Sequence, residues 1–163
     1  MADVKISDAS VAITVGEKII ALFRAIAGTE NVIVDEEQRN EYGHDKTEDY
    51  QFLPDLVIKP GTSQEISDIL KICNEHKIPA TPRGAGTGLS GGALPVKKGV
   101  VISMERFNKI LNIDELNLQA TVEPGVITEV FQNAVKEKGL FYPPDPASRG
   151  SCFLGGNLAN NSG

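Results

Sequence analysis

The chain has 163 residues, 40% of them hydrophobic and 23% charged, a balance that excludes a disordered or fibrous protein. It carries 22 acidic and 16 basic side chains. The net charge of −6 disfavours nucleic acid and anionic membranes as partners, since both select basic surfaces. No uninterrupted apolar run approaches the ~20 residues that a membrane span needs, so we expect no membrane-spanning segment.

The first ten residues and the two cysteines bear on the compartment. Residues 1–10 contain polar and acidic side chains where a signal peptide has an apolar stretch. Cys73 and Cys152 lie far apart and match no metal-ligand spacing, and without an export signal we expect both to be reduced. These features predict a cytoplasmic protein without a metal site.

The N-terminal third is predicted to hold one helix, one short strand and a long acidic loop. Residues 11–27 form the helix and Gly28 its C-terminal cap, because apolar residues recur at helical spacing. The expected buried face is Val11, Val15, Ile19, Leu22 and Ile26. Residues 31–35 are typical of a short strand. Residues 36–52 predict an exposed loop, in which Asp45 and its acidic neighbours form a solvated face.

A strand, a helix and a second strand are predicted next. Residues 56–58 and 78–81 are the strands. Thr62 begins the helix, with Glu65 in the position of a capping box, and the helix runs to about His76. The expected buried face of this helix is Ile66, Ile69, Leu70 and Cys73. This order of elements predicts a crossover unit in a parallel sheet.

The rest of the chain is predicted to be more antiparallel. Strands over residues 100–104, 110–113 and 118–123 are joined by short turns, as in a meander. Residues 128–138 form a helix that Gly139 ends, and a loop with one short helix follows. The expected buried face of the helix is Val130, Phe131, Ala134 and Val135. The fold class is therefore α+β, a small α/β unit followed by a more antiparallel one.

The stretch from Thr81 to Gly92 carries the strongest chemical signal. Its glycines free the main chain to adopt positive φ and to approach a ligand without interference from Cβ. Consecutive amides in such a turn converge into an anion-binding nest. Thr87 and Ser90 add hydroxyl donors, and Arg83 adds a positive charge. This combination predicts a pyrophosphate site.

Two familiar phosphate loops do not fit this stretch. Residues 86–91 match the dinucleotide fingerprint Gly-x-Gly-x-x-Gly, but that motif must open a helix, and here Pro95 and a β-branched strand follow. A P-loop ends in Gly-Lys-Ser/Thr, which this stretch lacks. A glycine-rich surface loop without a ligand stays open as the alternative, although glycine costs about 0.5–1 kcal/mol per position in regular structure.

Several stretches resemble the FAD-linked oxidases that share the FAD-binding fold of p-cresol methylhydroxylase and vanillyl-alcohol oxidase. Residues 83–92 resemble the pyrophosphate loop of that family, residues 143–148 its second flavin-contact turn and residues 155–163 its third. Residues 122–126 resemble the strand-to-helix turn between the first two. Within the family, the sequence is similar to the group of D-lactate dehydrogenase and the glycolate oxidase large subunit. The resemblance covers the chain from about Leu53 onward.

The resemblance implies which residues contact FAD. The cofactor-binding positions carried over are Arg83, Gly84, Ala85, Gly86, Thr87, Gly88, Leu89, Gly91, Gly92, Pro144, Asp145, Ser148, Gly155, Gly156 and Asn157. The glycine loop contains no histidine, and Cys152 is expected to be an inert buried thiol, so we expect non-covalent FAD. We assign residues 1–52 to an N-terminal helix and lead-in. Residues 53–163 then form a truncated PCMH-type (p-cresol methylhydroxylase) FAD-binding domain, and the catalytic domain lies outside this sequence.

The resemblance also implies an enzyme. It would be a flavin-dependent dehydrogenase or oxidase that moves a hydride from C2 of a small 2-hydroxy acid to flavin N5. Its partners would be that acid, bound through the missing domain, and an electron acceptor that the sequence does not identify. Two alternatives stay open: a non-catalytic nucleotide-binding module, and another FAD-linked oxidoreductase of this fold, such as a sugar oxidase or a cell-wall precursor reductase. The run at residues 83–92 favours the hydroxy-acid group.

Overall fold

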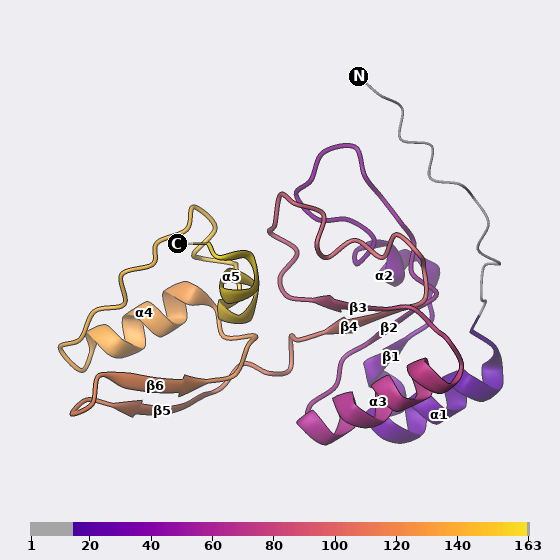
Figure 1. Cartoon of the computed structure of the whole chain (residues 1–163), viewed down its shortest axis with the longest axis horizontal. Coiled ribbons are helices and arrows are strands. Elements are labelled where there is room, and N and C mark those ends of the chain that lie inside the picture. The colour runs from indigo at the N-terminus through magenta and orange to yellow at the C-terminus, as the bar shows by residue number, and fades with distance from the viewer. Residues whose placement is uncertain (1–14, 163) are drawn as a thin grey trace.

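The computed structural model describes residues 15–162, which form two units lying side by side (Figure 1). The first unit holds a four-stranded sheet in the order β1-β2-β4-β3, and the second holds the two-stranded sheet β5-β6. Both units combine helices with strands, so the expected α+β class is confirmed. No helix among residues 15–162 is long and apolar enough to cross a membrane.

The helices and strands expected from the sequence are present, and most are shorter than expected. Residues 11–14 of the first expected helix lie outside the described residues. The elements are α1 (Glu17–Ala27), the 3-10 turn η1 (Thr29–Asn31), β1 (Val32–Ile33), α2 (Glu36–Asn40), β2 (Leu56–Ile58), α3 (Ser63–Glu75), β3 (Ala80–Arg83), β4 (Val100–Ser103), β5 (Ile110–Asp114), β6 (Gln119–Val122), α4 (Thr128–Lys136) and α5 (Leu154–Asn160).

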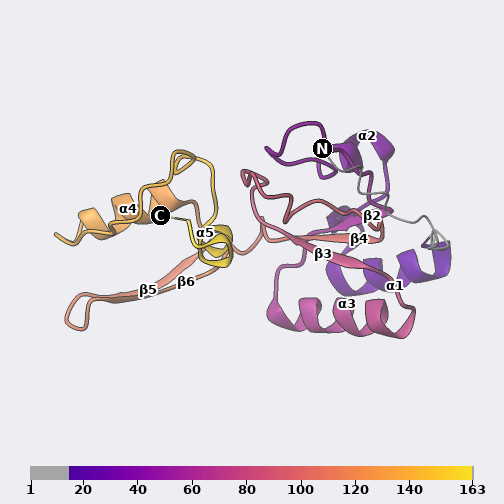
Figure 2. The same ribbon diagram turned by 45° about the horizontal axis from the view of Figure 1, so that its top comes forward.

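The two central strands of the first sheet, β2 and β4, are buried on both faces. Leu56 and Ile58 on β2, with their neighbours on β4, pack against α1 and α3, whereas Val57 and Val101 point the other way and pack against Tyr42. This alternation follows the two-residue period of a strand. Figure 2 shows the resulting layers, with α1 and α3 on one side of the sheet and α2 on the other. Residues on both sides of the expected boundary at 52/53 contribute to this unit, and the boundary itself stays a prediction.

The place of β4 corrects the expected meander. Instead of pairing with β5, β4 lies parallel to and between β2 and β3, with Val101 opposite both Val57 and Thr81. The reason is visible in the run Val100–Ile102, whose three residues are all buried. Continuous apolar runs are typical of central parallel strands that are covered on both faces. The crossover from β2 through α3 to β3 therefore skips the position that β4 fills.

Three expected core residues on the helices are exposed: Leu22, Leu70 and Val130. Each of these helices instead buries a pair of residues spaced four apart, which lie above one another on the same face, and α4 also buries Thr128 at its start. These pairs are Phe23 and Ala27 on α1, Ile69 and Cys73 on α3, and Phe131 and Val135 on α4. Because the helices are short and each rests on one small sheet, the buried face is narrower than the apolar pattern indicated.

The second unit is a hairpin covered by α4. Strands β5 and β6 pair antiparallel, as expected. Phe131 and Val135 of α4 pack with Val126, with Leu154 of α5 and with half-buried residues of the hairpin. Helix α5 lies on the side of this unit that faces the loop between β3 and β4 (Figure 1).

Candidate functional site

The glycine loop, residues 84–92, begins where β3 ends. Strands β2, β4 and β3 run parallel, so the loop lies at the edge of the sheet formed by their carboxyl ends. Ligands of open α/β sheets bind outside this edge. Gly86 and Gly91 have φ of 69° and 70°, in the left-handed region that favours glycine. Two glycines of the loop therefore have the positive φ that the sequence predicted, and the loop lies at an edge of the sheet suited to a ligand.

The main-chain amides over most of the loop have no acceptor among the residues that the structure describes. From Gly84 to Ser90, no amide donates a hydrogen bond to any acceptor among residues 15–162. The next amide, that of Gly91, is engaged, because it donates to Thr47 Oγ1 over 2.9 Å. A series of unpaired amides at one turn is a donor set suited to an anion. The unpaired N–H groups of the loop are thus suitable donors for the oxygens of a dinucleotide's diphosphate.

The glycines also leave space beside the loop. A Cβ built at Gly88, Gly92 or Gly156 would meet no protein atom within 4 Å. At Gly84 the nearest atoms belong to Phe153, 3.7 Å away, the residue that immediately precedes α5. The first and third predicted motifs therefore lie next to each other, with open space beside Gly88, Gly92 and Gly156.

Arg83 lies beneath the glycine loop. It is buried, and its guanidinium nitrogens are 3.4 Å from the main-chain oxygens of Glu41 and Tyr42. A Cβ at Gly86 would overlap the guanidinium, so the loop rests directly on this side chain. Burial lowers the pKa of Arg83 below its ordinary value, and the negative charge of Asp45 partly opposes that effect. The side chain supports the loop from below, and a direct contact with a phosphate stays a prediction.

Residues 41–47 form a part of the site that the sequence analysis missed. We expected a solvated loop here, but Tyr42 and Asp45 are buried, and Asp45 is only 7% exposed. The amide of Lys46 donates to the Gly88 carbonyl over 3.0 Å. The expected solvated face is therefore wrong for Asp45, because this segment folds against the glycine loop. The pair Tyr42-Gly43 inside an acidic stretch is the only local signal that could have suggested burial.

A charged cluster joins the ends of β2 and β4 below this segment. Glu105 accepts hydrogen bonds of 2.8 Å from both Lys59 and Tyr42. Burial acts to raise the pKa of Glu105, but these two hydrogen bonds outweigh it, so that pKa lies below its ordinary value. Burial also raises the pKa of Tyr42, which keeps its hydroxyl protonated as a donor. The cluster supports the face of the sheet next to Arg83.

The turn at residues 122–126 packs against the start of α5. The amide of Gly155 donates to the Pro124 carbonyl over 2.8 Å. A Cβ at Gly155 would lie only 2.6 Å from Pro124 Cβ, closer than real Cβ atoms approach. Gly155 is therefore required by protein packing. The amide of Gly156 has no acceptor among the described residues, so this glycine is the one that keeps a free donor.

Asn157 is held by a buried hydrogen-bonded group. Its Nδ2 donates to Thr128 Oγ1 over 2.6 Å, and the same oxygen lies 3.2 Å from Cys152 Sγ. All three residues are buried. One N–H of the Asn157 side-chain amide is therefore used within the protein, and its Oδ1 has no hydrogen-bond partner among residues 15–162. Both cysteines of the chain are unpaired and buried, as expected.

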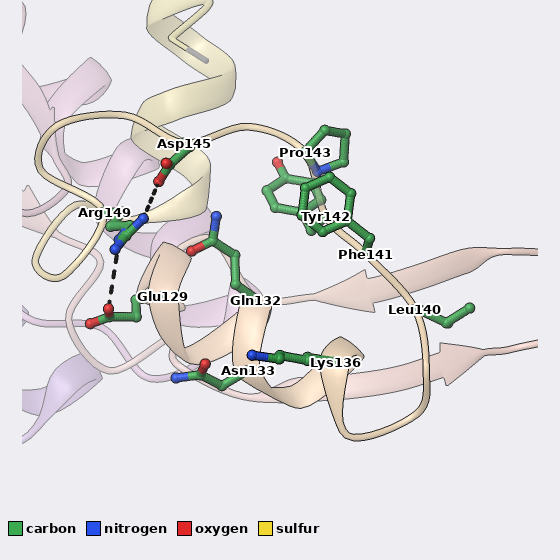
Figure 3. Close-up of a pocket in the computed structure, with 10 residues that line it drawn as sticks. All are labelled: Glu129, Gln132, Asn133, Lys136, Leu140, Phe141, Tyr142, Pro143, Asp145 and Arg149. Atoms are coloured by element: carbon green, nitrogen blue, oxygen red, sulfur yellow. Dashed lines mark hydrogen bonds and ion pairs between the residues drawn. The ribbon is translucent and has the colours of Figure 1, made fainter.

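Pro143, Asp145 and Arg149 line a hollow of about 350 Å³ beside α4, together with residues of α4 and of the segment that follows it (Figure 3). Asp145 accepts a 2.8 Å hydrogen bond from Arg149, which also faces Glu129 at 3.7 Å. Gln132 donates to the Pro144 carbonyl over 2.9 Å. The Ser148 carbonyl accepts from the Ser151 and Cys152 amides. Asp145 is thus engaged with a neighbouring base, and this hollow contains no residue of the glycine loop.

Comparison with known proteins places these features in a family. A family profile described as "FAD binding domain" matches residues 54–163. The glycolate oxidase subunit GlcD of Bacillus subtilis is 50% identical over 138 residues, which are 85% of this chain and 29% of the relative. A D-lactate dehydrogenase of Anaerostipes hadrus is 37% identical over 147 residues, covering 90% of this chain and 30% of the relative. A crystal structure of p-cresol methylhydroxylase aligns with a TM-score of 0.68 and 32% identity, over 76% of this chain and 25% of that one.

The fold and the open amide turn define a domain of the FAD-binding class. The chain belongs to the FAD-binding domain family, which confirms the resemblance inferred from residues 83–92, 143–148 and 155–163, and with it FAD as the cofactor. It spans about 29% of the length of the curated relatives it matches first.

Proposed function

We propose that this chain is the FAD-binding part of a flavin-dependent dehydrogenase or oxidase acting on a small 2-hydroxy acid of the D-lactate or glycolate type. The observation that carries the proposal is the series of unpaired amides from Gly84 to Ser90 within the matched family region. The relatives named glycolate oxidase subunit and D-lactate dehydrogenase support the substrate class.

In this proposal the chain binds and orients the cofactor. The glycine loop holds the diphosphate with its amides, and Gly156 and the Asn157 oxygen face it from the start of α5. FAD, when bound, would supply the redox chemistry: its N5 would take the hydride from C2 while the hydroxyl proton leaves to a base, which gives the 2-oxo acid. The Pro144–Ser148 turn lies near the flavin end. The chain positions this chemistry, and the residues that contact the acid belong to a further domain.

We propose that FAD is bound without a covalent bond. The glycine loop contains no histidine. The Cys152 sulfur is buried against Thr128, so it does not face an open site. Two unpaired cysteines are also compatible with the reducing cytosol, where we place the protein.

An absorption experiment tests the proposal. The full-length protein, with any sequence that continues beyond Gly163, is purified and its spectrum recorded near ~450 nm, where oxidised flavin absorbs. We expect a flavin band that bleaches without oxygen on adding D-lactate or glycolate. Flavin should be released by denaturation with acid, as for a non-covalent cofactor. A correctly folded protein that takes up no flavin contradicts the proposal, and a flavin reduced only by a sugar supports the alternative oxidase.

A further inference from the structure

We propose that residues 45–47, which precede the matched FAD-binding region, act as a clamp that holds the glycine loop in its binding conformation, with Thr47 as the positioning residue. This inference rests on the proposed function, because it assigns the clamp a role in binding the diphosphate. It gives a task to a segment that the family match, which begins at residue 54, does not include.

Two successive residues of the clamp hold the two ends of one turn. The Lys46 amide donates to the Gly88 carbonyl over 3.0 Å. Thr47 Oγ1 accepts from the Gly91 amide over 2.9 Å, across 44 residues of sequence. Thr47 is itself fixed, because its own amide donates to Asp45 Oδ1 over 2.8 Å. The clamp therefore uses one carbonyl and one amide of the loop.

The clamp also has a charged anchor beneath the loop. Asp45 is buried, and its Oδ2 has no hydrogen-bond partner among the described residues. Its charge acts on Arg83, whose guanidinium supports Gly86 from below. A buried carboxylate and a buried guanidinium lower each other's cost of burial. Asp45 thus belongs to the clamp through its Oδ1, which holds the Thr47 amide, and its negative charge acts on the guanidinium on which the loop rests.

The clamp matters for binding because of which groups of the loop it hydrogen-bonds and which it leaves unpaired. Glycine loses more conformational freedom on ordering than any other residue, so an unrestrained glycine loop would have to be ordered by its ligand. The clamp orders Gly88 and Gly91 beforehand and leaves the amides from Gly84 to Ser90 unused. The loop is then rigid at two points and still offers its donors.

Variants at Thr47 in the full-length protein test the inference. Thr47→Val removes the acceptor at nearly constant volume, and Thr47→Ser keeps it. We expect Thr47→Val to weaken FAD binding to the apoprotein about tenfold, as measured by flavin fluorescence titration. Thr47→Ser should restore the affinity to within about twofold of wild type. Thr121→Val is the matched control, because Thr121 is an exposed residue of β6 outside the clamp and the glycine loop, and its affinity should equal that of wild type.

Hydrogen exchange resolved to single amides gives a second measurement that needs no variant. In the wild-type apoprotein, the Gly91 amide should exchange more slowly than the amides from Gly84 to Ser90. Equal exchange at all these amides overturns the clamp, as does a Thr47→Val protein that binds FAD like wild type or a Thr47→Ser protein as weak as the valine variant. A wild-type protein that binds no FAD overturns the proposed function instead, and the exchange rates still decide whether the clamp exists.

Discussion

At Gly86 two requirements for glycine meet. Its φ of 69° lies in the left-handed region, which costs other residues roughly 1–2 kcal/mol, and a Cβ there would displace the Arg83 guanidinium. We therefore expect Gly86→Ala to weaken FAD binding at least tenfold by titration, since about 1.4 kcal/mol corresponds to a factor of ten.

Gly88→Ala is the variant to compare with Gly86→Ala, because a Cβ at position 88 would have no protein atom within 4 Å. Its free energy of unfolding without FAD should stay within about 0.5 kcal/mol of wild type, whereas FAD binding should weaken if the cofactor fills that space. Equal FAD affinity in Gly86→Ala and wild type would contradict the geometry of the loop.

Burial of Cys73 predicts a loss of stability at alkaline pH. Burial raises the pKa of the Cys73 thiol from 9.0 to about 11. The unfolded thiol ionises first, so the stability contribution is complete below pH 9 and is lost as the pH rises towards 11. We expect urea unfolding of the wild type to lose up to about 2–3 kcal/mol over this range relative to Cys73→Ala. If the free energies of unfolding of the two proteins changed equally with pH, the thiol would not be buried in solution.

At the scale of elements, the junction of α4 with α5 depends on one hydroxyl. Thr128→Val removes the acceptor of the buried Asn157 amide, and leaving that donor unpaired costs about 1–3 kcal/mol of unfolding free energy. Thr128→Ser keeps the hydroxyl and loses only a methyl group, about 0.8 kcal/mol. Urea unfolding distinguishes the two. A valine variant more stable than the serine variant would contradict the hydrogen-bonded group.

The helices and strands also show which structural features can be predicted from sequence patterns. Strand β2 was predicted to the residue, and the cap of α3 was correct: Thr62 Oγ1 accepts from the Glu65 amide over 3.1 Å. Such features depend on neighbours in sequence. The partner of β4 was predicted wrongly, because a run of buried residues indicates that a strand is covered on both faces but does not name the strands beside it.

For the whole molecule, the second unit exposes an apolar groove of about 550 Å³. Leu118, Phe141 and Leu158 line it and are 74%, 84% and 76% exposed. Exposed apolar surface of this kind promotes association. We expect the 163-residue chain to self-associate in sedimentation velocity as its concentration rises.

Phe141→Lys should weaken that association roughly ten- to hundredfold, since burying such a side chain contributes about 1.5–3 kcal/mol. Leu116→Lys is the control, because Leu116 is 90% exposed but does not line the groove. Equal association of Phe141→Lys and wild type would show that the groove is not the contact.

The sequence by itself determined the strand segments, every helix except α2, the α+β class, the family and the glycine loop, because each is encoded by residues close together in the chain. Helix α2 (Glu36–Asn40) lies in the stretch that was expected to be a loop, and that expectation was wrong. Only the tertiary structure decided that β4 enters the first sheet, that Asp45 is buried and that the amides from Gly84 to Ser90 find no acceptor within residues 15–162. Those properties depend on which distant segments meet, as Thr47 and Gly91 do across 44 residues. Local propensity and periodicity do not carry that information, since packing between segments chooses the partners.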